Sequence, residues 1–136
     1  MEAEPVYVKR NKLMRNHHST CVLHDDHLYG FDQGTLKCVD LRRGEEKWSG
    51  RGVGKGCVLY ADGHLIVLSE DGTLSLVEAT PAGFREKGKM QKILQGSDCW
   101  SLPALAGGRL YLRDHTQLIC LDVRKQKDEK VSGLAR

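Results

Sequence analysis

Three segments of this chain repeat one another, and the repeat is the feature that most limits its fold. Each copy has two or three apolar residues, a short turn centred on Asp or Gly, a basic residue and then a leucine. The copies are Cys21–Leu28, Val58–Leu65 and Pro103–Leu110. Asp and Gly between two apolar runs are the residues that a tight hairpin requires, so each copy predicts a strand, a turn and a second strand.

The second half of each copy predicts a third strand. A leucine is followed by an acidic residue four positions later in every copy, as Leu36–Asp40, Leu74–Glu78 and Leu118–Asp122. In the second copy Leu74 and Leu76 alternate with Ser75 and Val77, which is the period of a strand. No stretch keeps the spacing of an amphipathic helix.

The length of the repeat predicts its architecture. The repeat spans 37 residues from Leu28 to Leu65 and 45 residues from Leu65 to Leu110. A repeated four-stranded antiparallel unit of about 40 residues is typical of a β-propeller blade. We therefore expect an all-β protein with about three consecutive four-stranded antiparallel blades, a partial β-propeller whose ring is not closed. Three such units are too few to close a ring.

Length, charge and cysteine usage exclude several kinds of protein. The chain has 136 residues and a formal net charge of +3, so we predict one domain and no nucleic-acid partner. No apolar run approaches the roughly 20 residues of a membrane helix, and we predict no membrane insertion. The acidic segment Met1–Pro5 does not look like a signal peptide. The five cysteines are widely spaced and are interpreted as small buried residues rather than as disulfides or zinc ligands.

The segment Cys38–Trp48 resembles the A-x-D-x-x-T-G-x-x-x-W docking motif of quinoprotein-like β-propellers, the pyrroloquinoline-quinone repeat family. Asp40, Gly44 and Trp48 match the motif, whereas Cys38 stands in place of Ala and Arg43 in place of Thr. In that family the Trp packs against the neighbouring blade and ties the ring together. The resemblance implies that Cys38, Asp40, Gly44 and Trp48 form a structural docking motif.

The second copy keeps only a degenerate form of this motif. Glu78, Pro81 and Gly83 remain, and Lys87 or a nearby residue stands where Trp is expected. The third copy stops at Asp122, before the motif is complete. The family includes quinone-dependent dehydrogenases and the propeller lipoprotein of outer-membrane assembly, so the resemblance implies a periplasmic or secreted protein.

The order of the pieces predicts the C-terminal three blades of a longer propeller. Residues 1–123 form the partial propeller and residues 124–136 a charged tail. Val6–Val8 is predicted as the outer strand of a preceding blade. The predicted divisions are the end of that blade at 6–18, a blade at 19–50, a blade at 55–90 and an incomplete blade at 99–123.

One position of the repeat is a candidate ligand site. Alignment of the copies places His18, Lys55 and Trp100 at one equivalent position, with Asn16 and His17 beside it. In a propeller this position lies at one mouth of the central channel. The five residues are predicted to bind a small anionic or planar ligand at the channel rim. The alternative is that His18 and Trp100 only cover the inner strands.

Two other motifs predict no chemistry. His24–His27 contains possible metal ligands but lies in a hairpin turn where Asp-Asp is ordinary, and we predict no metal site. Gly50–Gly56 does not satisfy the phosphate-loop pattern and is interpreted as a flexible connection between blades. No nucleophile has an evident base, so no catalytic residue is predicted.

Two functions are compatible with the sequence. The first is a non-catalytic propeller fragment that acts as a scaffold or interaction surface, without a cofactor. Its partners would be the remaining blades of a parent propeller or a second copy of this chain, which would cover open faces predicted near Val22 and Leu36 and near Leu110 and Leu118. The alternative is the C-terminal part of a quinone-dependent alcohol or sugar dehydrogenase. Such enzymes hold pyrroloquinoline quinone between a Trp and two adjacent bonded cysteines, with calcium, and this chain has no adjacent cysteines.

Overall fold

The chain folds into three antiparallel β-sheets. A computed structural model describes residues 1–9 and 12–125, which contain eleven strands and no helix. The strands are β1 (Val22–His24), β2 (His27–Asp32), β3 (Thr35–Asp40), β4 (Glu45–Gly50), β5 (Gly56–Ala61), β6 (His64–Ser69), β7 (Leu74–Glu78), β8 (Glu86–Met90), β9 (Ala104–Ala106), β10 (Arg109–Arg113) and β11 (Leu118–Asp122). With no helix in the described part, no helix there could span a membrane.

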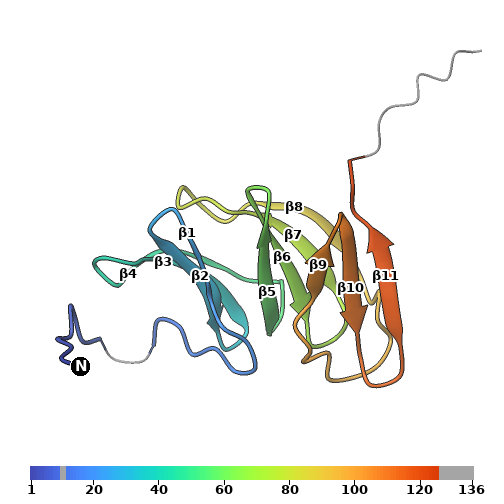
Figure 1. The fold of residues 1–136 in the computed structure, drawn as a ribbon, viewed down its shortest axis with the longest axis horizontal. Helices are drawn as coiled ribbons and strands as arrows, with labels where there is room; N and C mark the ends of the chain where they lie inside the picture. Colours follow the sequence, from blue (N-terminus) through green and yellow to red (C-terminus); the bar gives the residue numbers. More distant parts are fainter. Residues whose placement is uncertain (10–11, 126–136) are drawn as a thin grey trace, which may run out of the picture.

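Each sheet is a meander of strands that follow one another in the chain. The orders are β1-β2-β3-β4, β5-β6-β7-β8 and β9-β10-β11. The three sheets stand side by side in chain order and do not close a ring (Figure 1). The predicted fold class, a partial and unclosed all-β propeller, is confirmed. The first two sheets have four strands, and the third has three among the described residues.

The hairpin that begins each sheet turns through two residues of positive φ. Asp25 and Asp26 connect β1 to β2 with φ angles of 46° and 58°. The corresponding turns of the other sheets are Asp62-Gly63 and Gly107-Gly108, also of positive φ throughout. Positive φ at both central residues defines the type I′ turn, whose twist matches that of the flanking strands. The turn residues in the sequence therefore encode the hairpins directly.

Two apolar cores lie between the sheets. The core between the first and second sheets includes Tyr29, Leu36, Trp48, Leu65 and Val77. The core between the second and third sheets includes Ile66, Leu68, Leu94, Leu110 and Leu112. The sheets are held to one another by these side chains, since the backbone ladders run within each sheet. Face-to-face packing of this kind is how neighbouring blades of a propeller associate.

The predicted open faces need a correction. Leu36 and Leu110 are fully buried in the two cores and therefore face the second sheet. Val22 packs against the first core as well. Only Leu118 is exposed as expected, at 69%. Alternation along a strand separates its two faces but does not say which face meets a neighbouring sheet, and this is why three of the four residues were misplaced.

Val6–Val8 forms no strand in this chain, which corrects the prediction of a strand there. Val6 and Val8 are 88% and 84% exposed. The Tyr7 ring instead lies over Gly44, and its hydroxyl donates a 2.9 Å hydrogen bond to the carbonyl of Leu41. An apolar triplet becomes a strand only when another strand pairs with its backbone, and among the described strands none pairs with it. That residues 6–18 end a preceding blade remains a prediction.

Residues 12–16, here called the strap, cover the outer face of the first sheet. Met14 occupies the space left by the absent side chain of Gly30. Arg15 Nε lies 2.5 Å from Asp32 Oδ1. Lys37 Nζ donates to the carbonyl of Lys12 over 3.2 Å, so the strap is held by ionic and apolar contacts together.

Candidate functional site

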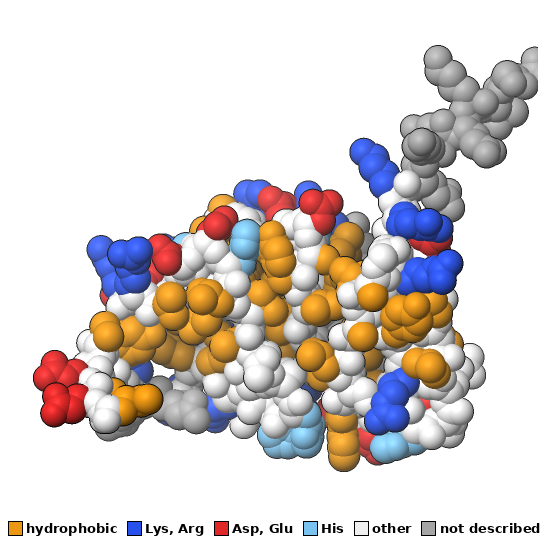
Figure 2. All heavy atoms as spheres, viewed as in Figure 1, with side chains coloured by type: hydrophobic (Ala, Val, Ile, Leu, Met, Phe, Trp, Pro, Cys, Tyr) orange, Lys and Arg blue, Asp and Glu red, His pale blue; other side chains and the backbone are white. Residues whose placement is uncertain are grey.

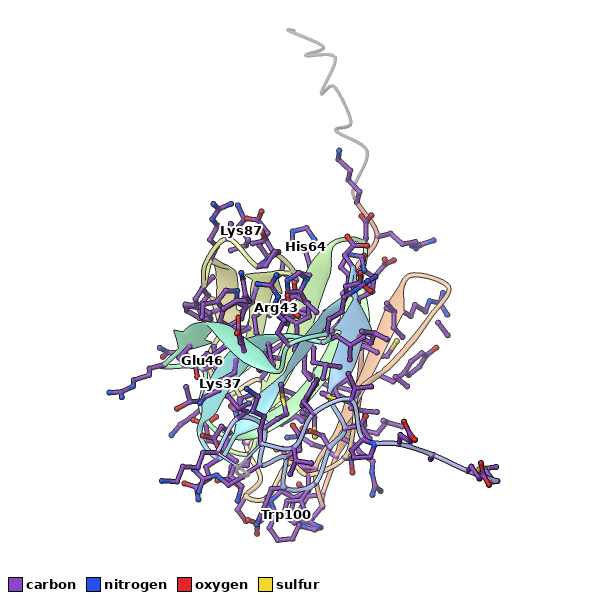
Figure 3. The ribbon with its side chains drawn as sticks, turned by 90° about the vertical axis from the view of Figure 1, so that its left-hand side faces the viewer. Lys37, Arg43, Glu46, His64, Lys87 and Trp100 are labelled. Atoms are coloured by element: carbon purple, nitrogen blue, oxygen red, sulfur yellow. The ribbon has the colours of Figure 1, made fainter. Side chains whose placement is uncertain are left out.

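The structure brings four of the five predicted rim residues together. The imidazole of His18 stacks on the indole of Trp100, with ring centroids 4.6 Å apart and planes 23° from parallel. His17 and His18 are linked through Nδ1 and Nε2 at 3.0 Å. Lys55 borders the same small space. We call His17, His18, Lys55 and Trp100 the rim cluster. Trp100 lies at the opposite end of the sheets from His64 and Lys87 (Figure 3).

Backbone hydrogen bonds between loops position the rim cluster. The N–H of Glu70 donates to the carbonyl of Lys55 over 2.8 Å, and the N–H of Cys99 donates to the carbonyl of Glu70 over 3.1 Å. Ser19 Oγ donates to the carbonyl of Gly56 over 3.3 Å. Loops from all three sheets are thereby joined at this end of the molecule. That this end of the sheets is the mouth of a propeller channel remains a prediction.

The rim cluster leaves little room for a ligand. The space among its side chains has a volume of about 10 Å³, roughly what one water needs. Lys55 Nζ is 3.7 Å from Glu70 Oε2, so a carboxylate lies beside the one ammonium group of the cluster. Trp100 is 45% exposed, and its other ring neighbour is His115, at 6.4 Å and nearly perpendicular. The arrangement offers an aromatic surface to solvent rather than a cavity.

Asn16 does not belong to the rim cluster. Its Oδ1 accepts the N–H of Phe31 over 2.9 Å, on the outer side of the first sheet. Asn16 therefore anchors the strap to β2. Sequence reasoning placed it by its neighbours in the chain, whereas its side chain turns back towards the sheet.

Sequence reasoning missed two neighbours of the rim cluster and the residue that anchors its loop. The neighbours are Glu70 and His115, which no motif of the sequence connects to this site. Asp114 is 7% exposed, and its carboxylate accepts the N–H groups of Gly96, Thr116 and Gln117. These backbone donors hold the pKa of Asp114 well below its ordinary range. Asp114 ties the loop that precedes Trp100 to the turn that carries His115. The acidic residue at the end of β10 was the signal in the sequence.

The docking motif begins with a capped turn. Asp40 Oδ1 accepts the N–H groups of Arg42 and Arg43, each over 2.9 Å. The bond from Arg43 is the main cause that lowers the pKa of Asp40. The N–H of Gly44 donates to the carbonyl of Asp40 over 2.8 Å, with Gly44 at φ +62°. Asp and Gly are the residues that such a turn favours, and the turn directs β4 back along β3.

Trp48 connects the first sheet to the second. It is 8% exposed and pairs across the sheet with Cys38. Its indole N–H donates a 2.6 Å hydrogen bond to the carbonyl of Thr80, and its ring lies 5.7 Å from that of Phe84. Thr80 and Phe84 belong to the connection between β7 and β8. Burial raises the pKa of the Cys38 thiol to about 11, which keeps this residue a neutral apolar neighbour of Trp48.

The second sheet has glycine where the first has Trp48. Trp48 pairs with Cys38, and the bulge of the ladder follows Cys38. In the second sheet Gly88 pairs with Leu76, and the bulge follows Leu76. Gly88, the neighbour of Lys87, is therefore the register counterpart of Trp48, within the range that the sequence predicts. The chain from Leu76 to Gly88 is two residues longer than that from Cys38 to Trp48, and this shifted the sequence alignment.

The residues of His24–His27 and Gly50–Gly56 contact other parts of the folded chain. His24 stacks on Tyr60 with ring centroids 4.2 Å apart. The ring of His27 hydrogen-bonds the carbonyl of Asp25 in its own turn, over 2.6 Å. Across residues 1–9 and 12–125, no group of three or more His, Cys, Asp and Glu side chains could hold a metal ion. In Gly50–Gly56, Gly50 lies under the Phe84 ring and Gly56 against the backbone of Leu68.

Comparison with known proteins identifies the fold. No protein-family model matches this chain, and a search of curated proteins found no match. Among solved structures, BamB from Moraxella catarrhalis is similar, with a TM-score of 0.62 and 18% sequence identity. The fold is a partial β-propeller. The alignment covers 76% of this chain and 32% of the BamB chain, so this chain spans about a third of that structure. Identity at this level shows the fold alone.

Proposed function

We propose that this chain is a non-catalytic, quinoprotein-like propeller fragment that acts as an interaction scaffold. It comprises the C-terminal three blades of such a propeller, acts in the periplasm or outside the cell, and takes further blades, from a parent protein or from a second copy, at its open end. The observation that carries the proposal is the third sheet, where β11 is an edge strand with no neighbour beyond β10 among the described residues.

The first two sheets show how a fourth strand would pair with β11. Their third strands, β3 and β7, each hold a fourth strand through a ladder that is interrupted by one bulge. In the third sheet, the N–H of Val123 donates to the carbonyl of Gly108, just before β10, and the carbonyl of Gln117 accepts the N–H of Asp114, just after β10. Hydrogen bonding alternates along an antiparallel strand, so the N–H of Cys120 points to the open edge. An exposed edge of this kind is a template for an added strand.

The outer face of the third sheet is also exposed, so a partner could pack against it. Leu118 on this face is 69% exposed. Hydrophobic side chains form a band across all three sheets (Figure 2). Large exposed apolar surfaces mark sites of protein association.

Sedimentation equilibrium of the purified chain tests this proposal. We expect self-association at micromolar concentration, above the 15.2 kDa monomer. Cys120→Pro removes the N–H at the open edge and should weaken association at least tenfold, because β10 does not use that donor. Cys120→Ser keeps the N–H and is the matched control. A monodisperse monomer that also fails to bind supplied upstream blades would contradict the proposal.

The alternative is a part of a quinone-dependent dehydrogenase. The residues present do not fit a quinone on Trp100, because His18 already stacks on its ring and no two cysteines are adjacent. Titration with pyrroloquinoline quinone and calcium distinguishes the two functions. We expect no saturable change in absorbance. Saturable quinone binding that Trp100→Ala abolishes would favour the dehydrogenase.

A further inference from the structure

A groove between the second and third sheets is the counterpart of the space that Trp48 fills between the first and second. Its volume is about 480 Å³, and it is lined by Ile66, Leu76, Gly88, Leu105, Leu110 and Val123. A Cβ atom added to Gly88 would have no neighbour within 4 Å. Pockets that hold small molecules have volumes of roughly 300–1,000 Å³ and mainly apolar walls.

The internal repeat shows what group such a groove accommodates. Three residues that line the groove are equivalent, by position in the repeat, to residues that pack with Trp48 in the first core. The pairs are Tyr29 and Ile66, Leu65 and Leu110, and Ala79 and Val123. The walls thus correspond, while the indole itself is replaced by Gly88.

The polar partner of the indole also has a counterpart. Thr80, which accepts the indole N–H of Trp48, lies two residues beyond β7. Arg124 lies two residues beyond β11. The residue before each makes the same bond: the N–H of Ala79 donates to the carbonyl of Gly63, and the N–H of Val123 donates to the carbonyl of Gly108, each over 2.9 Å. By register, the carbonyl of Arg124 is therefore the counterpart of that of Thr80.

We propose that the groove between the second and third sheets binds a small planar aromatic molecule of the indole class, with its N–H directed to the carbonyl of Arg124. A tryptophan on a paired strand cannot enter as Trp48 does, because β8 already occupies that strand position beside β7. The proposed occupant is accordingly a free molecule rather than a strand residue. This inference does not depend on how the ring is completed.

Titration of the full chain with indole, followed by amide shifts in ¹H–¹⁵N spectra, tests the proposal. We expect a dissociation constant of about 0.1–1 mM, in keeping with the affinity available to so few atoms. The shifts should centre on Ile66, Leu105 and Gly88. N-methylindole has no N–H to donate and should bind several-fold more weakly. Equal dissociation constants for indole and N-methylindole would show that the Arg124 carbonyl does not accept the indole N–H.

Gly88→Trp is the decisive variant. Its indole should fill the groove, weaken binding of free indole at least tenfold and raise the thermal midpoint. Gly34→Trp adds the same side chain at an exposed turn with no neighbour within 4 Å. It should change neither the affinity for indole nor the thermal midpoint. If Gly88→Trp does not fold, Leu76→Asp places a charge in the groove and should weaken binding equally. Unchanged affinity in these variants, or shifts centred on Trp100, would overturn the proposal. So would tighter binding of a Trp-containing peptide, since it would make the occupant a protein partner.

Discussion

The indole N–H of Trp48 donates a 2.6 Å hydrogen bond to the carbonyl oxygen of Thr80, across the boundary between the first and second sheets. One side chain thus fills the apolar core and satisfies a backbone acceptor of its neighbour. The rings of Tyr29 and Phe84 both neighbour its ring, with centroids 6.0 and 5.7 Å away. A buried Trp requires such a partner for its N–H, and this contact explains why the ring is directed to the second sheet.

Trp48→Ala should destabilise the chain by about 3–5 kcal/mol, because it removes a large buried side chain and leaves a cavity between two sheets. Urea unfolding measures this loss. Trp48→Phe keeps an aromatic ring and loses the hydrogen bond to Thr80, so it should have a smaller effect. A loss below about 1 kcal/mol for Trp48→Ala would mean that the two sheets do not depend on this contact.

Asp26→Gly should stabilise the first hairpin by about 0.5 kcal/mol. Asp26 has a φ of 58°, and the equivalent residues of the other hairpins are Gly63 and Gly108. Glycine adopts positive φ without steric cost. The substitution also removes an exposed ion pair with Arg42, which contributes little. Arg42→Ala removes that pair alone and serves as the control in thermal unfolding. Destabilisation by Asp26→Gly but not by Arg42→Ala would contradict the prediction.

Asp114 should make stability depend on pH in the acidic range. Its pKa is depressed in the folded state by backbone donors, whereas an unfolded Asp has a pKa near 3.9. The stabilisation is therefore complete above about pH 5 and decreases as pH falls through 4 and below. Urea unfolding between about pH 3 and 6 should show a shallower decrease for Asp114→Asn than for the unchanged chain. Other carboxylates with lowered pKa values, such as Asp32 and Asp71, account for the dependence of stability on pH that remains in the variant. An identical slope in both proteins would be evidence against this role.

His18→Ala should increase the access of solvent to Trp100. The imidazole covers one face of the indole, and a stacked pair of this kind contributes about 0.5–1.5 kcal/mol. Acrylamide quenching measures the access, in a Trp48→Phe background so that Trp100 alone reports. His115→Ala removes the perpendicular neighbour and should have a smaller effect. Unchanged quenching in His18→Ala would show that the stack does not persist in solution.

The sequence predicted the strands well because local chemistry determines them. Turn pairs such as Gly107-Gly108 require positive φ, and alternation along Leu74–Glu78 indicates a pleated surface. The meeting of His18 with Trp100 was also predictable, since equivalent positions of a repeat converge at one end of a propeller. Long-range geometry was not predictable. Nothing local says that Leu36 faces the second sheet.

The register of the fourth strands shows a second limit of sequence reasoning. A bulge after Leu76 and a longer connection place Gly88 opposite Leu76, and neither feature has a distinct residue pattern. Asn16 shows the same limit for the candidate site, because its side chain forms a contact with Phe31 that only the folded sheet creates.

The strap has a consequence for how the chain folds during synthesis. Domains fold as their residues leave the ribosome, and incomplete structures aggregate through exposed apolar surface. Residues 12–16 precede the first sheet and cover its outer face, so this face is protected as soon as β1–β4 have emerged. Each later sheet then pairs strands that are close in sequence, which favours rapid folding. The second and third sheets can thus be added one at a time to a first sheet whose outer face is already covered.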